Sequence, residues 1–154
     1  MPTTTAAALQ LWVTREPRLS PQIDRTGLQP AGHLVLVVDD DRGVLRLTAR
    51  MLRTEGYTVL EADSGAEALR LLDAEPDVQL VVTDVVMPGM HGLALAARIQ
   101  QRERRPQVVL MTGHAAELSV QLQERDPSMP LLLKPFTAQQ LLRTVRAALE
   151  PDRH

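Results

Sequence analysis

Polar side chains follow four apolar runs of this 154-residue chain, always close to the point where the run ends. The residues are Asp39, Asp40, Asp84, Thr112 and Lys134. Carboxylates gathered at one point repel, and each pair ~5 Å apart costs roughly 3 kcal/mol at an effective dielectric of 20. A divalent cation would offset that repulsion, while an ammonium and a hydroxyl beside it suit a phosphoryl group. These residue types therefore predict metal-assisted phosphoryl chemistry.

The donor set selects the kind of metal. The chain has no cysteine, so thiolate sites and disulfides are excluded, and its histidines are not paired at metal-ligand spacing. Hard oxygen ligands favour Mg²⁺, with Mn²⁺ or Ca²⁺ as substitutes. A carboxylate in such a setting can act as a nucleophile and form an acyl phosphate. Each residue taken singly has a plainer interpretation, since any Asp of Asp39-Asp-Asp41 could simply cap a helix.

The pattern of apolar residues predicts five strands, each followed by a helix. We expect strands at residues 34–38, 57–60, 78–82, 108–111 and 131–133, and helices at about 44–52, 64–72, 93–104, 115–124 and 137–149. The Ser64/Glu67 and Thr137/Gln140 pairs have the spacing of capping boxes. Strict alternation predicts an α/β fold, a parallel sheet with helices on both faces, whose ligands bind at the carboxyl ends of the strands.

The first 32 residues differ from the rest in composition. Proline and glycine recur there, and an apolar patch at residues 8–13 contains Trp12. We predict a mostly disordered tail over 1–32, one domain over 33–150 and a short C-terminal tail over 151–154. The net charge of −2 and 2% aromatic content disfavour nucleic-acid binding, and no apolar run suits a membrane span or a secretory signal. We expect a cytoplasmic location.

Four segments together resemble the receiver domain of two-component response regulators. They are Leu36-Val-Val-Asp-Asp-Asp41, Val82-Thr-Asp-Val-Val-Met-Pro-Gly-Met-His-Gly92, Val109-Leu-Met-Thr-Gly113 and Leu133-Lys-Pro-Phe136. The resemblance extends over about residues 34–149. It implies a flavodoxin-like (βα)5 fold, doubly wound, with strand order 2-1-3-4-5.

The resemblance also implies a role for each site residue. Asp84 is the expected phosphoacceptor and a Mg²⁺ ligand, with Thr112 as the switch hydroxyl and Lys134 as the partner of the phosphoryl group. The other expected Mg²⁺ contacts are Asp40, Asp39 through water, and the backbone carbonyl of Val86. Gly113 matches a position kept small for access, and Pro135 one that is usually preceded by a cis bond.

The same resemblance implies a signalling module rather than an enzyme, catalysing only its own phosphoryl transfer and dephosphorylation. Its expected partners are a sensor histidine kinase or a histidine phosphotransfer protein, and a downstream protein that the sequence does not identify. Partner binding would change at the face made by residues 115–124, 131–133 and 137–149, where a homodimer would also form. Four residues follow the last helix, so we expect a single-domain regulator.

Three positions depart from the usual pattern. Leu131 stands where many members have an aromatic residue, so the aromatic rotamer switch is absent. His91 replaces an acidic residue, which removes an acidic N-cap from the next helix. His114, two residues after Thr112, could orient or obstruct an attacking water, or point into solvent.

An enzymatic alternative is a Mg²⁺-dependent phosphatase of the haloacid-dehalogenase type, with Asp39 as nucleophile. That family requires Asp-x-Asp-x-Thr, and Asp39-Asp-Asp-Arg-Gly43 lacks the threonine. A flavodoxin-type cofactor binder is weaker still, because no Gly- or Thr-rich phosphate loop follows the first strand.

Overall fold

The computed structural model describes residues 32–113 and 129–150. Four predictions fall wholly or almost wholly outside these ranges: the N-terminal tail, the helix at 115–124, the role of His114 and the C-terminal tail.

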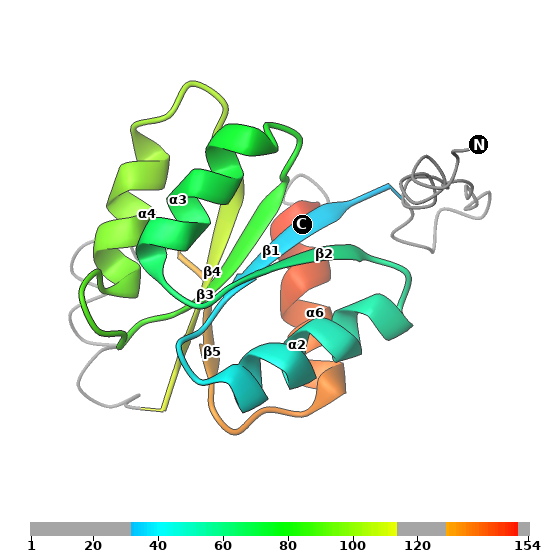
Figure 1. Cartoon of the computed structure of the whole chain (residues 1–154). Coiled ribbons are helices and arrows are strands. Elements are labelled where there is room, and N and C mark those ends of the chain that lie inside the picture. The colour runs from blue at the N-terminus through cyan, green and yellow to red at the C-terminus, as the bar shows by residue number, and fades with distance from the viewer. Residues whose placement is uncertain (1–31, 114–128, 151–154) are drawn as a thin grey trace, which may run out of the picture.

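The described residues form a five-stranded parallel sheet with helices between the strands (Figure 1). The elements in chain order are β1 Leu34–Val38, α2 Arg42–Thr54, β2 Thr58–Ala62, α3 Gly65–Ala74, β3 Leu80–Asp84, α4 Gly92–Gln100, β4 Gln107–Thr112, β5 Leu131–Leu133 and α6 Ala138–Leu149. The strand order is β2-β1-β3-β4-β5, and all neighbours are parallel. The predicted α/β fold and its 2-1-3-4-5 order are confirmed.

Helices cover both faces of the sheet. α2 and α6 pack on one face, and α3 and α4 pack on the other (Figure 1). The inner strands alternate between the two resulting cores: Val35 and Val37 of β1 face α2 and α6, while Leu36 and Val38 face α3 and α4. Burial on both faces explains why the strand sequences are continuous apolar runs rather than alternating ones.

The helix ends follow local capping, with two corrections to the sequence prediction. Thr137 and Gln140 form the full capping box, but Ser64 accepts only the backbone N–H of Glu67, whose side chain turns to Arg70 instead. α4 ends at Gln100 rather than near residue 104. Pro106 disfavours helical geometry in the residue before it, and the Arg105 side chain caps the Gln100 carbonyl at 3.1 Å.

None of the helices in the described ranges combines the length and the hydrophobicity that crossing a bilayer requires.

Candidate functional site

Three carboxylates meet at the carboxyl edge of the sheet. Asp39 directly follows β1, Asp40 comes next in the chain, and Asp84 is the last residue of β3. β1 and β3 are hydrogen-bonded neighbours, so their ends lie side by side. One oxygen from each of the three carboxylates lies within 4.8 Å of the other two. The cluster predicted from the sequence is therefore present.

The three consecutive aspartates have different structural tasks. Asp41 is the N-cap of α2, and its side chain accepts the backbone N–H groups of Gly43 and Val44. Asp39 is fully buried and accepts the backbone N–H of Asp41 at 2.9 Å. Asp40 is exposed. Capping is thus assigned to Asp41, which leaves Asp39 and Asp40 for the cluster.

Lys134 places its ammonium between two of the carboxylates. Its Nζ donates to Asp39 Oδ2 at 2.9 Å and to Asp84 Oδ1 at 3.2 Å. The lysine follows β5, and the next peptide bond, Lys134–Pro135, is cis as expected. One ammonium thus faces three carboxylates, and the cluster keeps an excess of negative charge.

The pKa values of Asp84 and Lys134 reflect their burial and the charges around them. Burial, and then the charge of Asp39, raise the pKa of Asp84 above its ordinary value, and Lys134 opposes that rise. Burial alone would lower the pKa of Lys134, but the hydrogen bond and charge of Asp39, together with Asp84, raise it overall. The lysine is therefore cationic at neutral pH, and the site favours a further positive charge beside Asp84.

Thr112 and Lys134 are joined through the backbone. Thr112 is the last residue of β4 and is almost fully buried, and its carbonyl accepts the backbone N–H of Lys134 at 2.8 Å. Thr112 is also paired in register with Leu133. The end of β4, which carries Thr112, is therefore hydrogen-bonded to the end of β5, which precedes Lys134.

A close backbone contact joins the two ends of the loop between β3 and α4. The sequence analysis did not predict this contact. Gly92 donates its N–H to the Val85 carbonyl at 2.7 Å, and a Cβ on Gly92 would lie 2.2 Å from the carbonyl oxygen of Asp84. Only glycine fits at that distance. A glycine soon after the acceptor motif was the available signal, but spacing alone does not reveal how closely two backbones approach.

Other predicted positions lie around the cluster. Val86 is in the same loop with its side chain half-exposed at 48%. A Cβ on Gly113 would meet no atom of residues 32–113 and 129–150 within 4 Å. Leu131 packs, partly buried, against the core under α3 and α4. His91 is the N-cap residue of α4 and makes no side-chain capping bond, as predicted.

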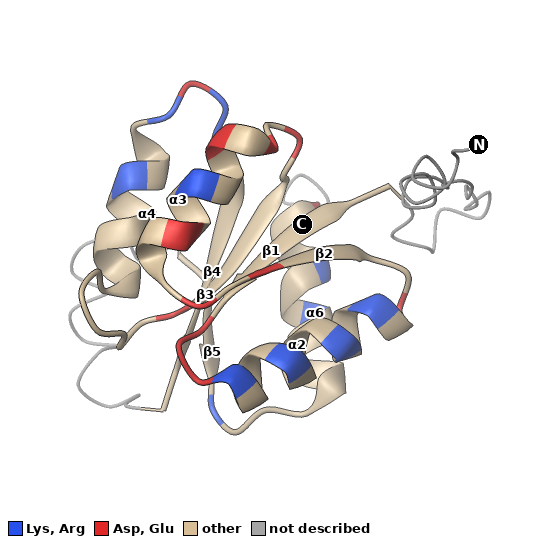
Figure 2. Cartoon of the chain, in the orientation of Figure 1, with Lys and Arg blue, Asp and Glu red and all other residues tan. Residues whose placement is uncertain are grey.

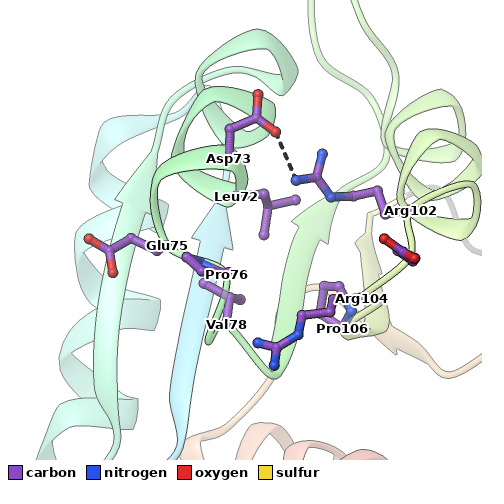
Figure 3. Close-up of a pocket in the computed structure, with 9 residues that line it drawn as sticks. Leu72, Asp73, Glu75, Pro76, Val78, Arg102, Arg104 and Pro106 are labelled. Carbon is purple, nitrogen blue, oxygen red and sulfur yellow. Dashed lines mark hydrogen bonds and ion pairs between the residues drawn. The ribbon is translucent and has the colours of Figure 1, made fainter.

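A pocket of about 360 Å³ lies at the opposite, amino edge of the sheet (Figure 3). Its lining includes Arg102, Arg104, Pro106, Pro76 and Val78. These residues lie between α3 and β3 or between α4 and β4, so the pocket lies at the far end of the strands from the carboxylates. It is not the site that the sequence predicts.

The donor chemistry of the cluster fits a hard divalent cation. Asp39, Asp40 and Asp84 offer carboxylate oxygens only, at mutual distances that one ion can bridge. Their charge exceeds what Lys134 neutralises, so binding a cation would relieve repulsion at Asp84.

Comparisons with known proteins agree on one family. The family model described as "Response regulator receiver domain" matches residues 35–146. The chain is 37% identical over 116 residues to the transcriptional regulatory protein GlrR of Escherichia coli, covering 75% of this chain and 26% of that protein. It is 36% identical over 117 residues to the sensor kinase CckA of Brucella abortus, covering 75% of this chain and 12% of that protein. The chain thus spans about a quarter or less of these two relatives.

Solved structures give the same result. A receiver domain protein from Clostridium thermocellum superposes with a TM-score of 0.70 at 28% identity, covering 79% of this chain and 97% of that chain. The receiver domain of NtrX from Brucella abortus superposes with a TM-score of 0.68 at 31% identity, covering 75% of this chain and 98% of that chain.

The phosphatase alternative gains no support. It requires Asp39 as nucleophile, but Asp39 is fully buried and holds Lys134 and the Asp41 backbone. The family match, the fold and the placement of the strand-end residues point the same way. This chain belongs to the response regulator receiver domain family, the phosphoaccepting signalling module of two-component systems.

Proposed function

We propose that Asp84 is the phosphoacceptor of this receiver and that it takes its phosphoryl group from a phosphohistidine of a sensor kinase or histidine phosphotransfer protein. The observation that carries this proposal is the position of Lys134, whose Nζ bonds both Asp84 and Asp39 inside a group of three carboxylates. Asp84 ends the central strand β3, and within the described residues Gly113 beyond the neighbouring β4 has space around it, which supports access by a donor.

In the proposed transfer, one carboxylate oxygen of Asp84 attacks the phosphorus. The oxygen–phosphorus bond forms while the bond from phosphorus to the donor nitrogen breaks, which leaves an acyl phosphate on Asp84 and a histidine that takes up a proton. Lys134 holds the acceptor oriented and partly neutralises the incoming phosphoryl oxygens. Thr112 follows as the hydroxyl that bonds the phosphoryl group, drawing the end of β4 with it.

Asp39, Asp40, Asp84 and the Val86 carbonyl are the residues that we propose hold Mg²⁺. The ion would neutralise charge on the acceptor and the phosphoryl group. The buried carboxylate of Asp39 also anchors Lys134, so the same side chain would serve the ion's surroundings and the lysine.

The output is proposed to be a change in protein binding rather than turnover of a substrate. Thr112 and Lys134 share a backbone hydrogen bond, so a shift at the phosphoryl group would reach β5 and the start of α6. Leu133 of β5, half-exposed at 48%, lies on the face expected to bind the downstream protein or a second copy. A chain without cysteine suits the cytoplasm, where we propose that it acts.

The test is the intact mass of the protein after incubation with acetyl phosphate and Mg²⁺. We expect one added phosphoryl group on wild type, and none after Asp84→Asn or when Mg²⁺ is chelated. Asp77→Asn is the matched control, because Asp77 is an exposed carboxylate at the other edge of the sheet. Labelling that survives Asp84→Asn would contradict the assignment.

A further inference from the structure

Three hollows at the amino edge of the sheet meet around one exposed arginine. Arg104 and Val78 line all three, including the pocket of Figure 3. The largest, about 840 Å³, also has Leu34 and Pro76 in its wall, and we call it the amino-edge hollow. Its size is within the range of about 300–1,000 Å³ that is usual for binding pockets. The proposed function makes no use of this edge.

The amino-edge hollow has an apolar wall and an exposed polar rim. Val78 is 6% exposed and Leu34 is partly buried, whereas Asp77 and Arg104, the charged residues that line it, are both exposed. A small polar ligand is normally fixed by polar groups held inside the pocket, and neither of these two is held there. An apolar centre with a polar rim is instead the arrangement of a surface that binds a polypeptide.

Arg104 is available for a further contact. Its Nη1 lies 3.6 Å from a carboxylate oxygen of Asp77, and the two side chains are 72% and 85% exposed. An ion pair this exposed contributes little to stability. A guanidinium attracts the face of an aromatic ring, and tryptophan is the best partner for it. The hollow therefore suits an apolar segment that contains a tryptophan.

The chain itself supplies such a segment. Gly32 lines the amino-edge hollow, so residues 1–31 are joined to its wall. Residues 8–13, Ala-Leu-Gln-Leu-Trp-Val, include Trp12, the one tryptophan of the sequence. Residues 14–31 connect them to Gly32, and a linker of about 18 residues has an r.m.s. span of roughly 21–25 Å. Such a link gives an effective concentration of the order of millimolar, so weak contacts suffice for docking.

Charges beside the hollow suit the same segment. Glu75 and Glu103 line the adjoining pocket, are exposed, and form no ion pair within residues 32–113 and 129–150. Figure 2 shows acidic residues at the end of α3 and in the loop after it, and both signs of charge in the loop after α4. Arg15 and Arg18 follow Trp12 by three and six residues, with one acidic residue between them. These two arginines complement the two unpaired glutamates.

We propose that residues 8–13 dock in the amino-edge hollow of their own chain, with the Trp12 ring on the guanidinium of Arg104. The docked segment connects the start of β1 with the loops before β3 and β4, whose residues line the hollow. Asp84 lies at the opposite edge of the sheet, so docking leaves it uncovered. The inference is independent of the proposed function.

One tryptophan and no cysteine make the contact measurable in the full-length chain. A single cysteine is introduced by Asp77→Cys, on the rim of the hollow, or by Arg46→Cys, exposed on α2, and is labelled with a nitroxide that quenches fluorescence at short range. Each labelled protein is also made with Arg104→Ser. Arg143→Ser is the matched control, because Arg143 is an exposed arginine on α6.

We expect Trp12 to emit at shorter wavelength in the native protein than in urea, and to be quenched more strongly by the label at position 77 than by the label at position 46. Arg104→Ser should weaken docking about two- to fivefold, which reduces the quenching from position 77, and Arg143→Ser should not change it.

Equal quenching from the two positions, or native emission at the wavelength seen in urea, would overturn the proposal. Unchanged quenching in Arg104→Ser would also overturn it. Quenching that disappears on dilution would assign the hollow to the segment of a second copy, which contradicts docking within one chain.

Discussion

The two edges of the sheet handle charge in opposite ways. At the carboxyl edge, Asp39 and Asp84 are buried and share one ammonium, that of Lys134. At the amino edge, Arg102 pairs with Asp73 at 2.8 Å in the pocket of Figure 3, with Asp73 exposed to solvent. Nearby, Arg104 and Asp77 pair at 3.6 Å, both largely exposed.

The contrast shows which feature marks the reactive site. A pocket lies at the amino edge, but each ion pair beside it has at least one largely exposed partner, and an exposed ion pair contributes little to stability. The carboxyl edge keeps buried charges without full compensation, which raises the pKa of Asp84. Buried charges of this kind lower stability and are typical of functional sites. A shifted pKa therefore identifies the functional edge of the sheet better than the presence of a pocket does.

The largest expected effect comes from removing the shared ammonium. Lys134→Met leaves Asp39 and Asp84 buried without their partner, and should lower the free energy of unfolding by about 3–5 kcal/mol at neutral pH. Arg102→Met at the amino edge should cost about 1 kcal/mol or less. Urea denaturation in metal-free buffer measures both, and equal losses would abolish the contrast between the edges.

The close backbone contact between Gly92 and Asp84 gives the next effect. Gly92→Ala forces a Cβ toward the Asp84 carbonyl at 2.2 Å, and should destabilise the domain by about 3 kcal/mol and slow labelling by acetyl phosphate. Gly113→Ala is the control, because its Cβ would meet no atom within 4 Å in the part of the chain that the structure describes. If Gly92→Ala unfolds and labels as wild type does, the loop is not held by this contact.

Neutralising Asp84 should stabilise the protein. The folded-state pKa of Asp84 is raised, so its carboxyl contributes stability below the ordinary value of 3.8 and loses it as pH rises through the folded pKa. Asp84→Asn should therefore gain about 2 kcal/mol at neutral pH and nothing in strong acid. Asp77→Asn should change stability at neither pH. Chemical denaturation across pH checks the sign, and a loss at neutral pH would contradict the account.

The smallest effect is that of the cation. With free Mg²⁺ about tenfold above its dissociation constant, linkage should add about 1.4 kcal/mol to the free energy of unfolding of wild type. The gain should shrink in Asp84→Asn and persist in Asp77→Asn. A thermal melt with and without chelator measures it, and equal gains in all three proteins would place Mg²⁺ elsewhere.

The continuous apolar runs of the strands, and their alternation with helices, made most of the fold and the carboxylate cluster predictable. The strands β1, β3 and β4 are buried on both faces of the sheet. Their sequences are therefore continuous apolar runs, which can be recognised without the structure. Once the sheet is parallel, the residues after its strands must share one edge, which brings Asp39, Asp84 and Lys134 together.

Two kinds of detail could not be predicted from the sequence: close tertiary contacts, and which of several equivalent side chains makes a given hydrogen bond. Nothing in Asp39-Asp-Asp41 says which aspartate caps α2, because that depends on where the helix starts. The Ser64/Glu67 spacing fits a capping box, yet Arg70 competes for the Glu67 side chain. The close approach of Gly92 to Asp84 depends on the tertiary structure, and the presence of a glycine in the sequence does not predict it.

The most direct test is to locate the phosphorylated residue chemically. The protein is treated with acetyl phosphate and Mg²⁺, the acyl phosphate is reduced with borohydride to the corresponding alcohol, and the peptides are sequenced by mass spectrometry. We predict that the aspartate-to-homoserine change falls at Asp84 alone. Reduction at Asp39 or Asp40 would contradict the central claim that Asp84 is the residue this site is built to phosphorylate.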